Sequence, residues 1–182
     1  MLIMTRIRRN TLIALVLCGS LVPLSIARPR RPAAPDFQCS VGGRQYRLSD
    51  FRGRVVVLDF WASWCGPCQR SLPEISRLSD AYSDAVFLGV NDESPTVIER
   101  TRRNLGLSFP SAYDSDGAIA DLFGVRALPT TIVIDRNGLI VEAIEGFRRD
   151  GAVMRAIELA RRGSVSLLNG HSDAPAAEEL ES

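Results

Sequence analysis

Two cysteines separated by two residues follow an apolar stretch of the chain. Cys65 and Cys68 enclose a Gly-Pro dipeptide, and the β-branched run of residues 55–60 stands directly before this motif. Two thiols at this spacing can form and break a disulfide, which is the chemistry of redox-active dithiols. Residues 55–60 predict a buried parallel strand, and apolar residues at helical spacing predict a helix over 69–82. The pair is therefore expected where a strand ends and a helix begins.

A helix N-terminus would change the reactivity of Cys65. It offers unpaired backbone N–H groups and the positive end of the helix dipole, both of which favour a thiolate over a thiol. We therefore predict that Cys65 is the nucleophile and that Cys68, about one turn further in, is the resolving thiol. Asp59 interrupts the apolar run, and burial would raise the pKa of its carboxyl so that it could exchange protons with Cys68. The alternative is that Asp59 caps the strand end or faces water.

Other uses of a cysteine pair fit the sequence less well. A structural zinc site needs four ligands, and the remaining candidates, Cys18, Cys39 and His171, are scattered through the chain. A haem attachment site needs a histidine directly after the second cysteine, where Gln69 stands. A permanently closed structural disulfide is a further alternative, although so small a loop restrains the unfolded chain little. Redox exchange without a metal or another cofactor is the favoured interpretation.

A second strand pattern lies in the C-terminal half of the chain. Residues 125–135 are rich in apolar and β-branched side chains, and Leu128 and Pro129 stand near their start. Residues 136–138 then predict a hairpin turn into a strand over 139–144. Spacing alone would leave Pro129 as an ordinary proline at a strand edge.

These motifs together resemble the thioredoxin superfamily. The resemblance rests on the Trp-Cys-Gly-Pro-Cys run at 64–68 behind a Val-Val-Val-Leu-Asp-Phe strand, and on the Leu-Pro-Thr-Thr run at 128–131. A hairpin predicted within 36–53 and a long insertion after the strand 86–91 are similar to the TlpA-like extracytoplasmic branch, the thiol-disulfide oxidoreductases of cytochrome maturation. The resemblance implies an α/β, thioredoxin-like fold: a central mixed sheet flanked by helices, with an N-terminal β-hairpin and an inserted helix-containing segment.

The resemblance also implies roles for individual residues. Cys65 and Cys68 would be the redox pair, and Asp59 would be the buried acid. Pro129 would be a cis-proline whose loop packs beside Cys65 and pairs its backbone with an extended substrate segment. The active-site turn and the substrate surface would include Trp64, Gly66, Pro67 and Leu128.

Two positions depart from the TlpA-like branch. Ser71 stands three positions after the second cysteine, where that branch often carries an acidic residue. Asp59 stands where that branch commonly has asparagine. The site therefore resembles thioredoxin within a TlpA-like frame.

The Gly-Pro dipeptide bears on the direction of electron flow. In thioredoxins it accompanies a strongly reducing couple. The resemblance thus implies a reductase of protein disulfides, with apocytochrome c or a copper-site protein as candidate clients and a membrane electron donor. Two alternatives stay open: a thiol peroxidase of the peroxiredoxin type, whose usual threonine is replaced by Ala62, and a non-catalytic binding module with an inert disulfide.

Composition and termini set the domain organisation. A chain of 182 residues with 46% hydrophobic residues can bury one core, and a formal charge of +1 gives no basic excess for nucleic acid. Arginines followed by an apolar segment predict a signal peptide or membrane anchor over 1–27, which points to a periplasmic or periplasm-facing protein. We expect a Pro/Arg-rich linker at 28–35, the thioredoxin-like domain at 36–163 and a disordered acidic tail at 164–182.

The remaining patterns predict scaffold. Helices are expected over 95–105, 117–123 and 150–162. Within the first of them, the arginines at 100, 102 and 103 are expected to form a solvated face. Cys39 is expected to be a buried, unreactive thiol, because its obvious partners are committed to each other.

Overall fold

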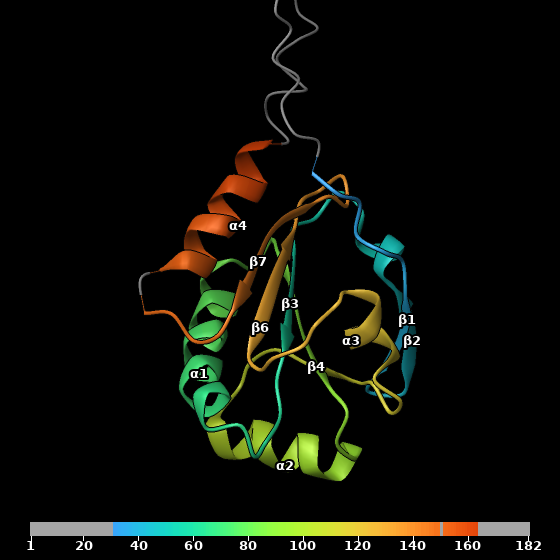
Figure 1. Cartoon of the computed structure of the whole chain (residues 1–182), viewed down its shortest axis with the longest axis vertical. Coiled ribbons are helices and arrows are strands. Elements are labelled where there is room, and N and C mark those ends of the chain that lie inside the picture. The colour runs from blue at the N-terminus through green and yellow to red at the C-terminus, as the bar shows by residue number, and fades with distance from the viewer. Residues whose placement is uncertain (1–30, 150, 164–182) are drawn as a thin grey trace, which may run out of the picture. The chain divides into compact units, whose positions relative to one another are not determined.

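Five strands form one mixed sheet at the centre of the protein. The computed structural model describes residues 31–149 and 151–163. The strands are β3 (Val56–Phe60), β4 (Val86–Asn91), β5 (Ser111–Tyr113), β6 (Thr130–Ile134) and β7 (Ile140–Glu145). Their order across the sheet is β5-β4-β3-β6-β7, with β3 parallel to β4 and antiparallel to β6 (Figure 1). The strand that leads into the dithiol is therefore the central one.

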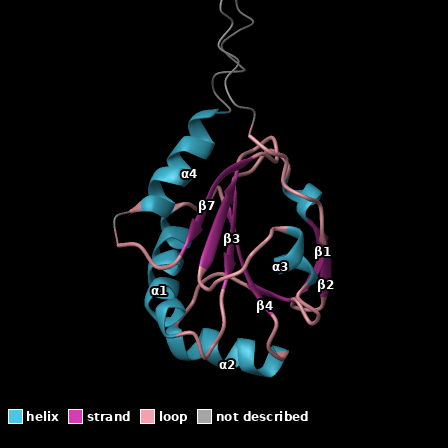
Figure 2. Ribbon diagram, viewed as in Figure 1, coloured by secondary structure: helices cyan, strands magenta, loops and turns pink. Residues whose placement is uncertain are grey.

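Helices and a hairpin cover the two faces of this sheet. Two helices, α1 (Gly66–Ala81) and α4 (Ala152–Gly163), pack on one face. The hairpin of β1 (Gln38–Val41) and β2 (Arg44–Arg47), the 3₁₀ turn η1 (Leu48–Phe51) and the short helix α3 (Ala118–Leu122) pack on the other. Helix α2 (Pro95–Leu105) follows β4 (Figure 2). This is the predicted α/β architecture, with its N-terminal hairpin and its inserted segment containing α2, β5 and α3.

The alternation of side chains along β3 decides which residues meet the helices. Val57 belongs to the core under α1 and α4, whereas Leu58 and Phe60 belong to the core under the hairpin and α3. Side chains of successive strand residues point to opposite faces, so Asp59 lies on the same face as Val57. Each fully buried aliphatic or aromatic side chain contributes roughly 1.5–3 kcal/mol to this packing. The α1 face is also the face that holds Cys68.

Two predicted boundaries differ from the observed ones. The strand pattern at 125–135 yields a strand only over Thr130–Ile134, because Pro129 lacks the N–H that a ladder needs and the residues before it form a loop. Helix α1 begins at Gly66, earlier than the predicted 69, with Pro67 in its first turn, where a missing N–H has no effect on the helix.

Part of the segment predicted as a linker pairs with the β6–β7 hairpin. The backbone N–H of Ala34 donates to the carbonyl oxygen of Gly138 at 2.9 Å, and that of Ile140 donates to Pro32 at 2.8 Å. Arg31 forms an ion pair with Asp135 at 3.6 Å. Residues 31–34 therefore belong to the folded unit.

The predicted leader at 1–27 and the predicted tail at 164–182 lie outside the described residues. In the part of the chain that the structure describes, no helix has the length and apolar character needed to cross a bilayer.

Two smaller expectations have opposite outcomes. Cys39 is buried without a disulfide partner, as predicted, and burial raises the pKa of its thiol to about 11. Arg102 is not part of a solvated face: its Nε donates to the carbonyl oxygen of Phe109 at 2.9 Å and its guanidinium pairs with Glu99. The arginine thus joins α2 to the segment that precedes β5, a contact between a helix and the chain that follows it, which helical periodicity does not reveal.

Candidate active site

Cys65 occupies the N-cap of helix α1 and is joined to Cys68 by a disulfide. The backbone N–H of Cys68 points at Cys65 Sγ, 3.2 Å away. Cys65 is 5% exposed, whereas Cys68 is completely buried. The N-terminal N–H groups of α1 are therefore directed at the outer sulfur, where they stabilise negative charge once the disulfide opens.

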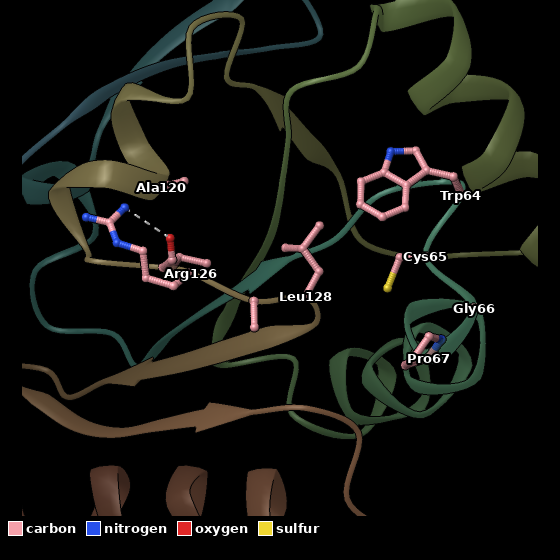
Figure 3. A pocket seen from close by; sticks show the side chains of 9 residues that line it. Trp64, Cys65, Gly66, Pro67, Ala120, Arg126 and Leu128 are labelled. Atoms are coloured by element: carbon pink, nitrogen blue, oxygen red, sulfur yellow. Dashed lines mark hydrogen bonds between the residues drawn. The ribbon is translucent and has the colours of Figure 1, made fainter.

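A groove of about 590 Å³ lies in front of Cys65. Its walls are the dithiol turn, residues 64–67, and, across from it, Ala120 and the loop 125–128 (Figure 3). The lining is mainly apolar, and among the described residues that form it the one charged side chain is Arg126, which pairs with Asp121 at 2.9 Å. The groove can accept an extended chain whose sulfur reaches Cys65.

The Leu128–Pro129 peptide bond is cis, the isomer that the resemblance implies. Leu128 lines the groove, while Pro129 itself is buried, and its carbonyl oxygen accepts the N–H of Gly146 at 2.7 Å. Pro129 thus sits just before β6, and its neighbour Leu128 presents the loop to the groove.

The two tryptophans beside the dithiol have opposite environments. Trp64 is 72% exposed at the groove, whereas Trp61 is 1% exposed beneath the turn. The indole N–H of Trp61 donates to Ser111 Oγ at 3.3 Å. A side chain at Gly89 would overlap both partners, so this glycine makes room for the bond. Strand β5 of the inserted segment therefore supports the turn from below.

Asp59 is completely buried in the middle of the sheet. Thr131, its neighbour on β6, donates a hydrogen bond from Oγ1 to Asp59 Oδ1 at 2.7 Å. Within the described part of the chain, Asp59 Oδ2 has no hydrogen-bond partner. Burial raises the pKa of Asp59 to about 7, against the smaller lowering effect of the Thr131 hydrogen bond. The alternative of an exposed, capping Asp59 is wrong.

Ser71 is buried in α1 on the same side of the sheet as Asp59. Its hydroxyl donates to the carbonyl oxygen of Cys68 at 3.1 Å, so the position where an acidic residue often stands in relatives carries no titratable group here. Ser71 and Thr131 both line a narrow cleft between α1 and the start of α4. Among the described carboxyls that are buried, Asp59 is the one nearest in sequence to the dithiol.

Three contributors to the site were not predicted from the sequence. Thr131 lies in the Leu-Pro-Thr-Thr run, and its position two residues after Pro129 at the start of a predicted strand was the signal available for it. Ala120 and Arg126 reach the groove from the inserted segment and the loop before β6, and only the folded topology brings them to Cys65.

Comparison with known proteins places this arrangement in a family. A model of the AhpC/TSA family matches residues 31–143, more than half of the chain. The chain belongs to the AhpC/TSA family. Among the relatives of this AhpC/TSA protein is thiol-disulfide oxidoreductase ResA from Geobacillus thermodenitrificans, 39% identical over 117 residues that cover 62% of this chain and 67% of the relative.

Solved structures agree with this membership. The AhpC/TSA protein is similar to the crystal structure of a thiol:disulfide interchange protein of the DsbE type from Chlorobium tepidum, with a TM-score of 0.67 and 34% identity, covering 72% of this chain and 96% of that one. It is also similar to the exposed lipoprotein thioredoxin Etrx1 from Streptococcus pneumoniae, with a TM-score of 0.62 and 31% identity, covering 69% and 99%. These findings confirm the predicted thioredoxin-like fold and the predicted enzyme class, a thiol-disulfide oxidoreductase with the disulfide Cys65–Cys68.

Proposed function

We propose that this AhpC/TSA protein is an extracytoplasmic reductase of protein disulfides. The observation that supports it best is the unequal access to the two sulfurs: Cys65 lines the groove, whereas Cys68 has no exposed surface. A client disulfide can reach Cys65 alone. The first attack therefore falls to Cys65, and the resolving attack falls to Cys68.

The exchange starts from the reduced pair. The Cys65 thiolate attacks one sulfur of a client disulfide, a Cys65–client disulfide forms, and the second client sulfur leaves as a thiolate that takes a proton from water. Cys68 then gives its proton to Asp59 and attacks Cys65 Sγ, which expels the first client sulfur as a thiolate. Two electrons pass to the client, and the protein is left with the Cys65–Cys68 disulfide.

Asp59 suits the proton transfer because of its location and its pKa. It lies on the face of β3 that α1 covers, and α1 carries Cys68. A carboxyl with a pKa of about 7 is present in both protonation states near neutral pH, so it can accept a proton during resolution and return it during re-reduction. Cys68 does not line the groove and has no exposed surface, so a buried acid is the suitable proton acceptor for it.

The groove and the loop before β6 would bind the client as an extended segment. Residues 125–128 lie opposite the dithiol turn, and the cis peptide at Pro129 fixes the path of the chain there. Trp64, Gly66 and Pro67 would form the other wall. The mainly apolar lining favours a client segment with apolar residues beside its cysteine.

The resemblance supports the proposed direction, clients and location. The Gly66-Pro67 dipeptide accompanies reducing couples in thioredoxins, and the resemblance to the TlpA-like branch suggests apocytochrome c or a copper-site protein as clients and a membrane electron donor. The arginine-led apolar segment over 1–27 supports export, and one similar structure is that of an exposed lipoprotein.

A trapping experiment tests the proposal. Cys68→Ser leaves the nucleophile in place and removes resolution, so the variant should accumulate mixed disulfides with exported proteins that dithiothreitol releases. The variant Cys65→Ser/Cys68→Ser is the matched control and should trap nothing. Absence of any trapped protein from Cys68→Ser would contradict a protein reductase.

Two further measurements separate the alternatives. A redox titration against glutathione and dithiothreitol should give a reversible couple more reducing than glutathione, whereas an inert binding module would give none. Peroxide consumption by the reduced protein should be no faster than that of a free thiol, whereas a thiol peroxidase would exceed it by orders of magnitude.

A further inference from the structure

A carboxylate from outside the dithiol motif holds the turn that leads to Cys65. Glu93 lies in the connection between β4 and α2, where it is partly buried. Its two oxygens accept hydrogen bonds from Ser63: the backbone N–H reaches Oε2 and the hydroxyl reaches Oε1, both at 2.6 Å. Ser63 stands two residues before Cys65. A residue 30 positions away in sequence thus bonds the turn through both a backbone and a side-chain group.

Glu93 is itself fixed from the strand side. Asn91, at the end of β4 and 2% exposed, donates its Nδ2 to Glu93 Oε2 at 3.2 Å. The backbone N–H of Glu93 donates in return to Asn91 Oδ1 at 2.6 Å. The carboxylate therefore has a position set by β4, one of the two strands that flank β3.

The carbonyl side of Ser63 is held as well. Gln69, in α1, donates its Nε2 to the carbonyl oxygen of Ser63 at 2.8 Å. The N–H, the hydroxyl and the carbonyl of Ser63 are all hydrogen-bonded, two of them to Glu93 and one to the helix that carries the dithiol. The segment between β3 and α1 has no regular secondary structure, so these bonds add to the two backbone bonds that hold it, from Trp61 to Val90 and from Cys65 to Ala62.

The carboxylate is charged in the working range of pH. Burial raises the pKa of Glu93, but the hydrogen bonds from Ser63 and Asn91 and the charge of Arg100 outweigh that effect, so the pKa lies below its usual value. Hydrogen bonds to an ionised acceptor are about twice as strong as neutral ones. Removal of the acceptor would leave the Ser63 N–H, which is partly buried, without a partner.

We propose that Glu93 is a positioning residue for thiol-disulfide exchange: it clamps Ser63, and through it the turn that places Cys65 Sγ at the N-terminus of α1 and at the groove. The inference rests on exchange chemistry at Cys65 and assigns no client or direction. When the clamp is lost, the turn moves, Cys65 leaves its N-cap geometry for part of the time, and the thiolate loses the N–H groups that stabilise it.

Two substitutions at this position separate the clamp from a simple charge effect. Glu93→Ala removes both acceptors and the charge. Glu93→Gln removes the charge but keeps the clamp, because the amide can accept the Ser63 N–H and donate to the Ser63 hydroxyl. A negative charge disfavours a thiolate, so a pure charge effect would make both variants more reactive than the wild type.

The readout is alkylation of Cys65 in the reduced full chain by iodoacetamide at pH 6, followed by mass spectrometry of the Cys65 peptide. Glu93→Ala should react about 3- to 10-fold more slowly than the wild type, which is what the net loss of one hydrogen bond amounts to. Glu93→Gln should react at the wild-type rate or faster. Glu99→Ala, which removes an exposed carboxylate on α2, is the matched control and should change nothing.

The remaining outcomes overturn the proposal. Equal rates for Glu93→Ala and the wild type would show that the clamp does not act on Cys65, and faster alkylation of both variants would leave only a charge effect. If Glu93→Ala does not fold, Ser63→Ala replaces it: loss of the hydroxyl bond alone should slow alkylation in the same direction, and an unchanged rate would refute the clamp. Alkylation needs no client protein, so failure of the trapping experiment and failure of this one are distinguishable.

Discussion

Thr131 and Asp59 are joined across the β3–β6 pair by a hydrogen bond of 2.7 Å between a hydroxyl and a carboxylate oxygen. The bond connects the strand that leads into the dithiol with the strand that follows Pro129. The bond is buried, and it favours the charged form of the Asp59 carboxyl. Burial acts in the opposite direction and raises the pKa of that carboxyl to about 7. Both the stability of the protein and the rate of its resolving step should depend on this contact.

The first prediction concerns stability against pH. The pKa of Asp59 is 3.8 in the unfolded chain and about 7 in the folded one, so the folded protein binds the extra proton between these values. The contribution of Asp59 to stability is therefore fully present below pH 4 and is lost as the pH rises to 7, by about 4 kcal/mol in total, since each pKa unit corresponds to about 1.4 kcal/mol.

Urea unfolding of the oxidised protein from pH 4 to pH 8 measures this loss. The oxidised form is used because its disulfide removes thiol titration from the comparison. Asp59→Asn lacks the titrating group, so its unfolding free energy should stay flatter over the same range. Parallel pH profiles for the two proteins would show that Asp59 does not titrate as described.

The second prediction concerns the pH dependence of resolution. If Asp59 accepts the Cys68 proton, release of a model client from the mixed disulfide should accelerate as the pH rises through about 7, and Asp59→Asn should be slower by about 100-fold or more. Thr131→Val removes a bond that lowers the pKa of Asp59, so the midpoint of the rate profile should move to higher pH.

Stopped-flow measurement of client release between pH 5 and pH 9 gives these midpoints. Thr130→Val is the neighbouring comparison, because the Thr130 hydroxyl bonds the carbonyl oxygen of Ala127 and does not touch Asp59. Its midpoint should equal that of the wild type. A Thr131→Val midpoint that stays in place or falls would remove Asp59 from the resolving step.

The third prediction separates the two tryptophans. Trp64 is 72% exposed, so Trp64→Ala should change the free energy of unfolding by less than about 0.5 kcal/mol. The same variant should raise KM for protein clients and leave the reduction of a small disulfide unchanged, because Trp64 lines the groove, which a small disulfide does not fill. Trp61→Ala should instead destabilise the protein by about 3–5 kcal/mol.

Urea unfolding together with turnover of a protein client and of a small disulfide tests both variants. The pair is matched, since the two residues flank the same turn and differ in burial. Equal effects of Trp64→Ala on the two substrates would show that the exposed indole does not contribute to client binding.

The sequence predicted the features that depend on local spacing. An apolar run followed by two cysteines and an amphipathic segment was enough to place Cys65 at a helix N-terminus, because strand and helix periods are local properties. The burial of Asp59 was also predictable, since apolar residues flank it on both sides. The thioredoxin-like fold and the cis peptide at Pro129 came from resemblance instead, because neither spacing nor composition sets a peptide isomer.

What the sequence left out depends on contacts between distant segments. Glu93 reads as an ordinary acidic residue before a helix, and only the parallel pairing of β3 with β4 brings it to Ser63. Arg102 has the spacing of a solvated helix face, yet its guanidinium donates a hydrogen bond to the carbonyl oxygen of Phe109, which lies outside its helix. The loop at 125–129 has the composition of a strand. It does not join the sheet, because Pro129 at its end lacks the N–H that strand pairing requires.

The pairing of residues 31–34 with the β6–β7 hairpin also sets an orientation. Strand β6 runs antiparallel to β3, so its hairpin lies at the end of the strands opposite Cys65, while Pro129 lies at the same end as Cys65. Arg31, the first described residue, therefore enters the fold at the end of the strands opposite Cys65. The groove in front of Cys65 thus opens at the end of the sheet that this N-terminal pairing leaves uncovered.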